Sequence, residues 1–188
     1  MTRRFLALLL CALPLMASAA DFDLDRLLGQ LAQTRSAHAT FTEKQYLTLL
    51  DKPLESSGEL AYEAPGHLEK RTLQPKVESL VLDGGTLTVE RGGKRHVLKL
   101  QDYPEIAAFI DSIRATMAGD RRALEAAYRT ELDGRYERWT LQLTPTAPKM
   151  LAKVSRVKIS GVRADLRQIE IVQADGDRSV MSIARAAP

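Results

Sequence analysis

Along most of the chain, apolar and polar residues alternate with a period of two, the spacing of β-strands that are buried on one face. Turn residues divide this pattern into short segments, which predicts a series of strands. The strands are expected at 39–49, 55–63, 67–73, 77–82, 86–91, 95–100, 128–132, 136–144, 153–161, 166–173 and 178–184. Tight turns are expected where glycine accepts a positive φ without steric cost, at 83–85, 92–93, 132–134 and 175–177. Strands joined so closely predict an antiparallel meander.

Two segments have helical periodicity instead. Leucines recur at i, i+3, i+4 and i+7 from residue 24, which predicts a helix over 24–35 with Asp23 as its N-cap. A second helix is expected after Asp102 as N-cap, closed by Gly119 in the left-handed conformation, and a short helix over 120–128. The apolar stripe of the second helix consists of Ile106, Phe109, Ile110, Ile113 and Met117. The predicted fold is mainly β, with a curled antiparallel sheet of about eleven strands forming an incomplete, half-open β-barrel covered by two or three helices.

The first twenty residues have the pattern of a cleavable secretory signal peptide. Arg3 and Arg4 precede an apolar run over 5–16, and the small residues of 17–19 provide a cleavage site. The apolar run is shorter than the roughly 20 residues that span a bilayer. Cys11 follows a leucine where a lipoprotein signal has a small residue, so lipidation is not expected. We therefore expect a signal peptide at 1–20, a single domain at 21–188, and a location in the periplasm.

Charge and reactive side chains argue against several classes of function. The chain carries a net charge of +3, and removing Arg3 and Arg4 leaves 25 basic against 24 acidic residues, which is not typical of a nucleic-acid-binding protein. The histidines do not have the spacing of metal ligands; they are His38, His67 and His96. Clustered charges such as those at 69–71 are interpreted as part of a solvated outer face. We expect no cofactor, no metal and no enzymatic activity.

One face of the expected sheet is apolar, and it is the candidate ligand-binding surface. The residues expected to line a cavity there are Phe41, Leu60, Tyr62, Leu80, Leu87, Val89, Leu98, Trp139, Leu141, Leu143, Ile169 and Ile171. Two interpretations remain open from the pattern. The helices at 24–35 and 105–117 can fill the concave face as an ordinary core, or the second helix can act as a lid over a cavity for apolar ligands.

Several motifs make the chain similar to the LolA family, periplasmic carriers of outer-membrane lipoproteins in Gram-negative bacteria. The resemblance extends from the first helix to about Arg185. The motifs that carry it are Phe41-Thr42-Glu43, Ser56-Ser57-Gly58-Glu59-Leu60, Ala64-Pro65-Gly66, Gln74-Pro75, Ser79-Leu80-Val81-Leu82-Asp83-Gly84, the strand from Trp139 to Pro145, and Ile169-Glu170-Ile171. The resemblance implies an incomplete barrel with a helical lid over a cavity that takes acyl chains. It also implies an inner-membrane release complex and an outer-membrane acceptor as partners.

Some positions differ from the pattern of that family. Ala64 occupies the position of an arginine that holds the lid closed, and Leu68 and Lys70 replace a pair of aromatic residues. Aromatic character is also missing at 87–89, and the C-terminal extension is shorter. These differences place the chain with a divergent branch of LolA-like proteins.

The resulting prediction is a monomeric periplasmic carrier that binds the acyl chains of a lipoprotein or related lipid and shuttles it between the membranes. One alternative cargo is a glycolipid or an aryl-polyene-type lipid. Alternative functions for the same fold are a lipid-sensing module and an assembly factor with a filled core.

Overall fold

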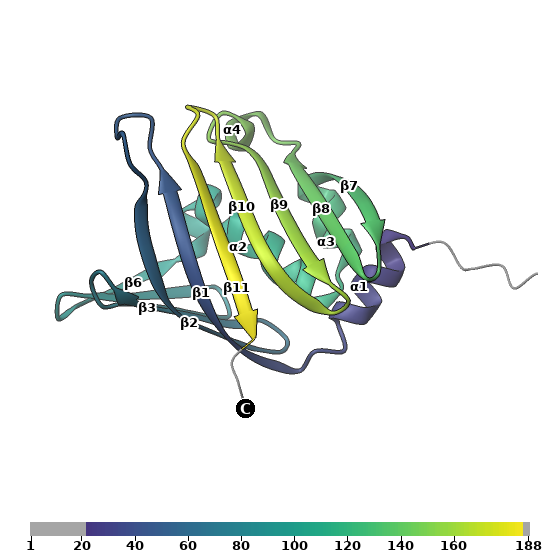
Figure 1. Ribbon diagram of the computed structural model, residues 1–188, viewed down its shortest axis with the longest axis horizontal. Helices are drawn as coiled ribbons and strands as arrows, with labels where there is room; N and C mark the ends of the chain where they lie inside the picture. Colours follow the sequence, from purple (N-terminus) through teal and green to yellow (C-terminus); the bar gives the residue numbers. More distant parts are fainter. Residues whose placement is uncertain (1–21, 186–188) are drawn as a thin grey trace, which may run out of the picture.

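A computed structural model describes residues 22–185; within α2, the side chains of Pro104, Glu105, Ile106 and Ala108 are not described. Over this range the chain forms a single curled antiparallel sheet with helices on its concave face (Figure 1). The strands are β1 Ser36–Tyr46, β2 Leu54–Glu63, β3 His67–Gln74, β4 Glu78–Asp83, β5 Thr86–Arg91, β6 Lys94–Lys99, β7 Tyr128–Arg135, β8 Arg138–Pro145, β9 Val154–Val162, β10 Asp165–Gln173 and β11 Arg178–Arg185. The signal peptide expected at 1–20 lies outside the described residues.

The strand order is β6-β5-β4-β3-β2-β1-β11-β10-β9-β8-β7, so the sheet consists of two meanders joined where β1 pairs with β11. All eleven expected strands and the half-open barrel are confirmed, because the strands at the two ends of this order, β6 and β7, do not pair with each other. The period-two pattern predicts this sheet well because each strand buries only one of its faces.

Helices precede β1, connect β6 to β7, and connect β8 to β9. They are α1 Leu24–Leu31, the short 3₁₀ helix η1 Leu100–Asp102, α2 Pro104–Ala118, α3 Arg121–Ala127 and α4 Pro148–Leu151. Asp23 caps α1 by accepting a hydrogen bond from the Arg26 amide, and Gly119 ends α2 with a φ of 74°, as expected. None of the helices in the described range is long and apolar enough to cross a membrane.

Four expectations about boundaries are wrong. The first helix ends at Leu31, before the expected residue 35, and β1 ends at Tyr46, so residues 47–49 form a loop. Asp102 belongs to η1, and Tyr103 occupies the N-cap position of α2. The turn expected at 132–134 lies within β7, which continues to Arg135. The sequence pattern does not determine where these elements begin or end, because the residues that flank a helix or strand can continue its apolar–polar pattern.

Two apolar clusters lie on the concave side of the sheet. The larger cluster joins α1 and α3 to β7–β10, and its buried members include Leu27, Leu28, Leu124, Trp139, Leu141, Leu143, Val157 and Ile159. The smaller cluster lies on β4–β6 and η1, with buried Leu82, Leu87 and Leu100. Helix α2 contributes to both, because Phe109 and Ile113 pack against the larger cluster while Ala107 and Ile110 pack against the smaller one.

Candidate ligand-binding face

The half of the sheet formed by β7–β10 is filled with side chains. Trp139, Leu141 and Leu143 are almost completely buried among residues of α1 and α3. The Trp139 indole donates a hydrogen bond of 2.8 Å to the Arg163 carbonyl, which fixes the ring in place. Ile169 is buried in the same cluster, and Ile171 packs partly buried against it. In this half, the side chains expected to line a cavity belong to a packed core.

The half formed by β2–β6 is covered less completely. Leu80 lies directly opposite Val89, and Leu87 lies opposite Leu98, so these side chains share one face of the sheet. Leu87 is buried, but Leu80, Val89 and Leu98 are only partly buried around the smaller cluster. Leu60 on β2 is likewise half-buried. We define Leu60, Leu80, Leu87, Val89 and Leu98 as the apolar face; it is the part of the concave surface where apolar area remains uncovered.

The remaining expected residues lie at the borders of this face. Phe41 on β1 and Tyr62 on β2 are buried. On α2, Phe109, Ile110 and Ile113 are half-buried and Met117 is buried, while the side chain of Ile106 lies outside those described. Among the described side chains of α2, the most buried are Ser112 and Thr116, whose hydroxyls donate hydrogen bonds to carbonyl oxygens one turn back in the same helix. Small polar residues therefore occupy the most buried positions of α2, which the apolar stripe in the sequence does not reveal.

A buried polar group interrupts the apolar face. Lys70 lies directly opposite both Leu60 and Leu80, so it faces inward, and the expectation that the charges at 69–71 all belong to a solvated outer face is wrong for Lys70. Its ammonium group lies 2.5 Å from Glu43 Oε2 and 4.9 Å from the centre of the Phe41 ring. The hydroxyl of Ser179 is 2.5 Å from Glu43 Oε1.

Glu43 is only 6% exposed, so its charge depends on these partners. Burial by itself raises the pKa of the Glu43 carboxyl, but the hydrogen bonds from Lys70 and Ser179 and the charge of Lys70 outweigh this effect and lower the pKa below its usual value of 4.5. The result is an ion pair at the border of the apolar face, in which both carboxylate oxygens of Glu43 accept a hydrogen bond. This ion pair is a polar site at the edge of a surface that is otherwise apolar.

An arginine of α2 ties this helix to the turns of the sheet. Arg114 Nη1 donates a hydrogen bond of 2.8 Å to the carbonyl of Gly84, in the β4–β5 turn. The Arg114 side chain also lies against Gly66, where an added Cβ would be 3.1 Å from its Nε. Gly66 lies two residues after Ala64, the position where the resemblance described above implies a lid-holding arginine. The link between helix and turns is therefore present, with its arginine on the helix.

A crevice of about 660 Å³ runs along α2 beside this link. Its lining combines Arg114 and Pro65 with Leu100 and Ala107, two members of the smaller cluster. Tyr128 lines its other side, and burial raises the pKa of this phenol to about 12, so the phenol is neutral at ordinary pH. The crevice is thus lined by residues of η1, α2 and α3, and it reaches the smaller cluster at Leu100 and Ala107.

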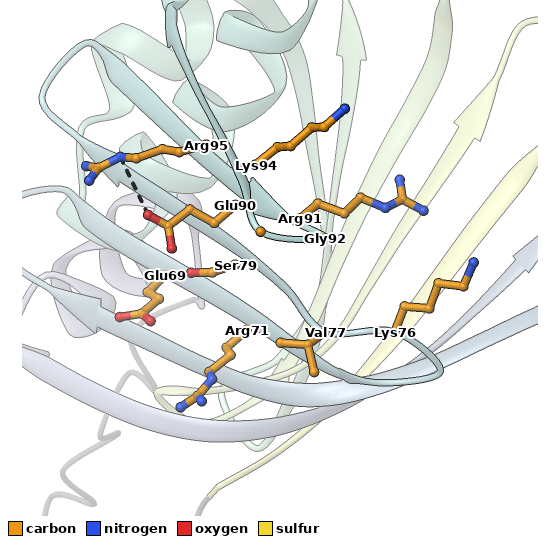
Figure 2. Close-up of a pocket in the computed structure, with 11 residues that line it drawn as sticks. Glu69, Arg71, Lys76, Val77, Ser79, Glu90, Arg91, Gly92, Lys94 and Arg95 are labelled. Atoms are coloured by element: carbon orange, nitrogen blue, oxygen red, sulfur yellow. Dashed lines mark ion pairs between the residues drawn. The ribbon is translucent and has the colours of Figure 1, made fainter.

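A second hollow, of about 1020 Å³, lies on the opposite face of β3–β6 and is strongly charged (Figure 2). Arg71, Ser79 and Glu90 are directly opposite one another across the strands and point away from the apolar face. Lys76, Arg91 and Lys94 extend from the turns at its end. We call this hollow the charged groove; its polar lining does not suit an apolar ligand.

A family model described as outer membrane lipoprotein carrier protein LolA-like matches residues 16–188. No curated protein matches the sequence. A chain in the Pseudomonas aeruginosa MucA/MucB complex is similar in structure, with a TM-score of 0.51 and 15% identity, over 88% of this chain and 58% of that chain.

Two further solved structures are similar at lower scores. The LolA superfamily protein NE2245 from Nitrosomonas europaea has a TM-score of 0.43 and 10% identity, over 89% of this chain and 96% of that one. The Mycobacterium tuberculosis lipoprotein LppX has a TM-score of 0.42 and 12% identity, with coverages of 84% and 89%. At such identities, similarity to a solved structure extends to the fold alone.

Proposed function

The chain belongs to the family of outer membrane lipoprotein carrier proteins that are LolA-like, and from this premise we propose that it carries the acyl chains of a lipoprotein or related lipid through the periplasm. The cargo would lie on the apolar face, beneath α2. This role requires an inner-membrane complex that releases the cargo and an outer-membrane acceptor that receives it, with the carrier acting as a monomer and performing no chemistry.

The observation that carries the proposal is the uneven covering of the concave surface. Leu80, Val89 and Leu98 remain partly exposed on a face that points toward the helices, whereas Leu141 and Leu143 are completely buried. Each acyl methylene that moves from water onto such a face contributes about 0.8 kcal/mol. A lipid chain can therefore be held without any specific polar contact.

Helix α2 is proposed as the lid. It contacts both apolar clusters, and the crevice along it reaches Leu100 and Ala107 of the smaller one. Movement of α2 would break the bond from Arg114 to Gly84 and uncover Ile110 together with the strand leucines. The polar pair of Glu43 and Lys70 would then lie at the border of the opened face, where it can meet a polar group of the cargo, such as the sugar of a glycolipid.

The test compares two identical substitutions on opposite faces of neighbouring strands. Val89→Trp places an indole on the apolar face, and Val97→Trp places one on the outer face, where Val97 is 60% exposed. Binding of a fluorescent fatty acid is measured with protein from a Gram-negative periplasm, and native mass spectrometry identifies any lipid that co-purifies. We expect Val89→Trp to weaken binding by about tenfold or more, because the indole occupies the space of the chain, and Val97→Trp to change it by less than about twofold.

Circular dichroism checks that both variants are folded. Equal affinities in the two variants, or a wild-type protein that carries no lipid and takes up no added fatty acid or lipopeptide, would refute the carrier proposal. That second outcome would favour a filled core with an assembly or sensing role.

A further inference from the structure

Five chain connections lie along the same edge of the curled sheet. In the order of the strands they are β5–β6 at 92–93, β3–β4 at 75–77, β1–β2 at 47–53, β10–β11 at 174–177, and the segment 146–153 between β8 and β9 that contains α4. Figure 1 shows the loops of β1–β2 and β10–β11 and the α4 segment at the top of the molecule. We call this edge, with the strand residues next to it, the hairpin end.

Exposed apolar side chains are concentrated at the hairpin end. Among the described residues, nine large apolar side chains are exposed, and only Val97 and Tyr103 lie elsewhere. The other seven are Tyr46, Leu49, Leu50, Leu54, Leu73, Val77 and Leu151. Scattered exposed leucines need no explanation, but clustering on neighbouring connections indicates an interaction surface.

The β1–β2 loop is the most apolar part of this end and is held in a defined conformation. Leu49 is 94% exposed, and Leu50 and Leu54 are about half exposed. Both the amide and the hydroxyl of Thr48 bond to Asp177 Oδ1, at 2.8 and 3.0 Å, and the Leu50 amide bonds to the Leu47 carbonyl at 2.9 Å. The loop is thus tied to the β10–β11 turn in a way that presents its leucines to solvent.

Basic side chains accompany these leucines. The exposed lysines of the hairpin end are Lys52, Lys76, Lys94, Lys149 and Lys153. The side chains of Lys76, Arg91 and Lys94 extend to the same side of their turns at the end of the charged groove (Figure 2).

The acidic side chains nearby are mostly engaged within the fold. Asp175 and Asp177 accept hydrogen bonds from backbone amides of the turns. Glu55, Glu78 and Glu90 lie within 4 Å of Lys44, Arg91 and Arg95 respectively, and Asp51 lies in the β1–β2 loop. Asp51, Asp175 and Asp177 keep their negative charges, so the five lysines outnumber these three acids by two, and the surface around the exposed leucines is positive.

We propose that the hairpin end docks on the surface of an anionic phospholipid bilayer. The leucines of the β1–β2 loop enter the boundary between headgroups and acyl chains, and the lysines lie near lipid phosphates. Exposed leucines combined with lysines match this surface on both counts, since apolar side chains gain from the acyl boundary and ammonium groups from the negative surface potential. The inference concerns a different surface from the apolar face and does not depend on the carrier proposal.

The test is co-sedimentation of the protein purified from a bacterial periplasm with vesicles of phosphatidylcholine, with and without phosphatidylglycerol, at low and high salt. We expect binding to vesicles that contain phosphatidylglycerol, weakened by salt. The double variant L49D/L50D should bind at least about tenfold more weakly, because two carboxylates replace the inserted leucines. Val97→Asp is the matched control, because Val97 is exposed on the outer face and away from the hairpin end; it should bind as the wild type does.

A charge variant, K76E/K94E, separates the two contributions. It should lose the preference for phosphatidylglycerol, whereas L49D/L50D should keep this preference while binding more weakly. The inference would be overturned if the wild-type protein bound none of the vesicles, or if L49D/L50D and Val97→Asp lost vesicle binding equally. Binding only to vesicles that contain a membrane protein would also overturn it and would assign the hairpin end to a protein partner. Fatty-acid binding by L49D/L50D should remain unchanged, so failure here is distinguishable from failure of the carrier proposal.

Discussion

A single lysine, Lys70, places a charge on the inward face of β3, where its neighbours across the sheet are leucines. The charge is tolerated because the carboxylate of Glu43 meets it and Ser179 satisfies the second carboxylate oxygen. Such a pair contributes little compared with apolar packing, but removal of one partner leaves the other charge buried and uncompensated.

Lys70→Met should therefore destabilise the protein by about 3 kcal/mol at pH 7, measured by urea unfolding. The folded-state pKa of Glu43 lies below 4.5, so the stability that the pair provides is fully present above pH 4.5 and is lost as the pH falls through that lower pKa. The difference between wild type and variant should accordingly shrink in acid. Lys44→Met is the control: Lys44 and Glu55 form an ion pair in which both side chains are exposed to water, so this change should leave the free energy of unfolding nearly unchanged. An equal loss in both variants would contradict the argument.

The pairing of Lys70 with Glu43 could not be predicted from the sequence. The two residues come from β1 and β3, and β2 lies between these strands. The position of β2 between them, directly opposite Phe41, is Gly58, which has no side chain. The alternating pattern of β3 predicts correctly that Leu68 and Lys70 share a face, but the charge of Lys70 suggests that this face is wet.

At the scale of elements, α2 was predictable as an apolar helix, but its attachment was not. The apolar stripe of this helix predicts that Phe109, Ile110 and Ile113 face the sheet, and these residues do pack against the two apolar clusters. The contact that holds the helix to the β4–β5 turn is a hydrogen bond from Arg114 to a backbone carbonyl. Because every residue has a backbone carbonyl, the sequence pattern does not reveal which one Arg114 binds. Elements were thus predictable from periodicity, and their docking was not.

Arg114→Ala should loosen α2 without unfolding the sheet. Loss of one hydrogen bond costs about 1 kcal/mol, so amides of α2 should exchange with deuterium about fivefold faster while those of β8 and β9 keep their protection. Hydrogen–deuterium exchange followed by mass spectrometry measures both regions at once. Arg122→Ala, at an exposed position of α3, is the control and should leave α2 unchanged. Unchanged exchange in α2 of the Arg114 variant would show that apolar packing alone holds this helix.

At the scale of the whole molecule, the proposed function would place lipid binding in one half of the sheet and most of the packed core in the other. The larger cluster fills the half formed by β7–β10, and the smaller cluster covers the half formed by β4–β6 only in part. The alternation of the sequence is the same in both halves. The sequence therefore predicts an apolar concave face but cannot distinguish a filled half from an uncovered one, since this depends on where α1 and α3 dock.

Leu141→Ala and Leu80→Ala make this division measurable. Leu141 is completely buried, so its truncation should cost about 3 kcal/mol in urea unfolding, whereas Leu80 is half-buried and should cost about 1 kcal/mol. Fatty-acid binding should respond in the reverse order, being weakened more by Leu80→Ala. Comparable costs for the two truncations would mean that both halves are equally well packed.

The pairing of β1 with β11 has a consequence for how the chain is made. The register joins Ala39 to Arg185 and Tyr46 to Arg178, so the two meanders meet through residues more than a hundred positions apart. Each meander can form from local hairpins as it is synthesised, but one edge of β1 stays without a partner until the last strand arrives. Pairing of strands so far apart in the sequence is slow, because a long loop must close first. During that time the unpaired edge of β1 can form hydrogen bonds with strands of other chains. The time between synthesis of β1 and arrival of β11 is therefore when the nascent protein is most exposed to aggregation.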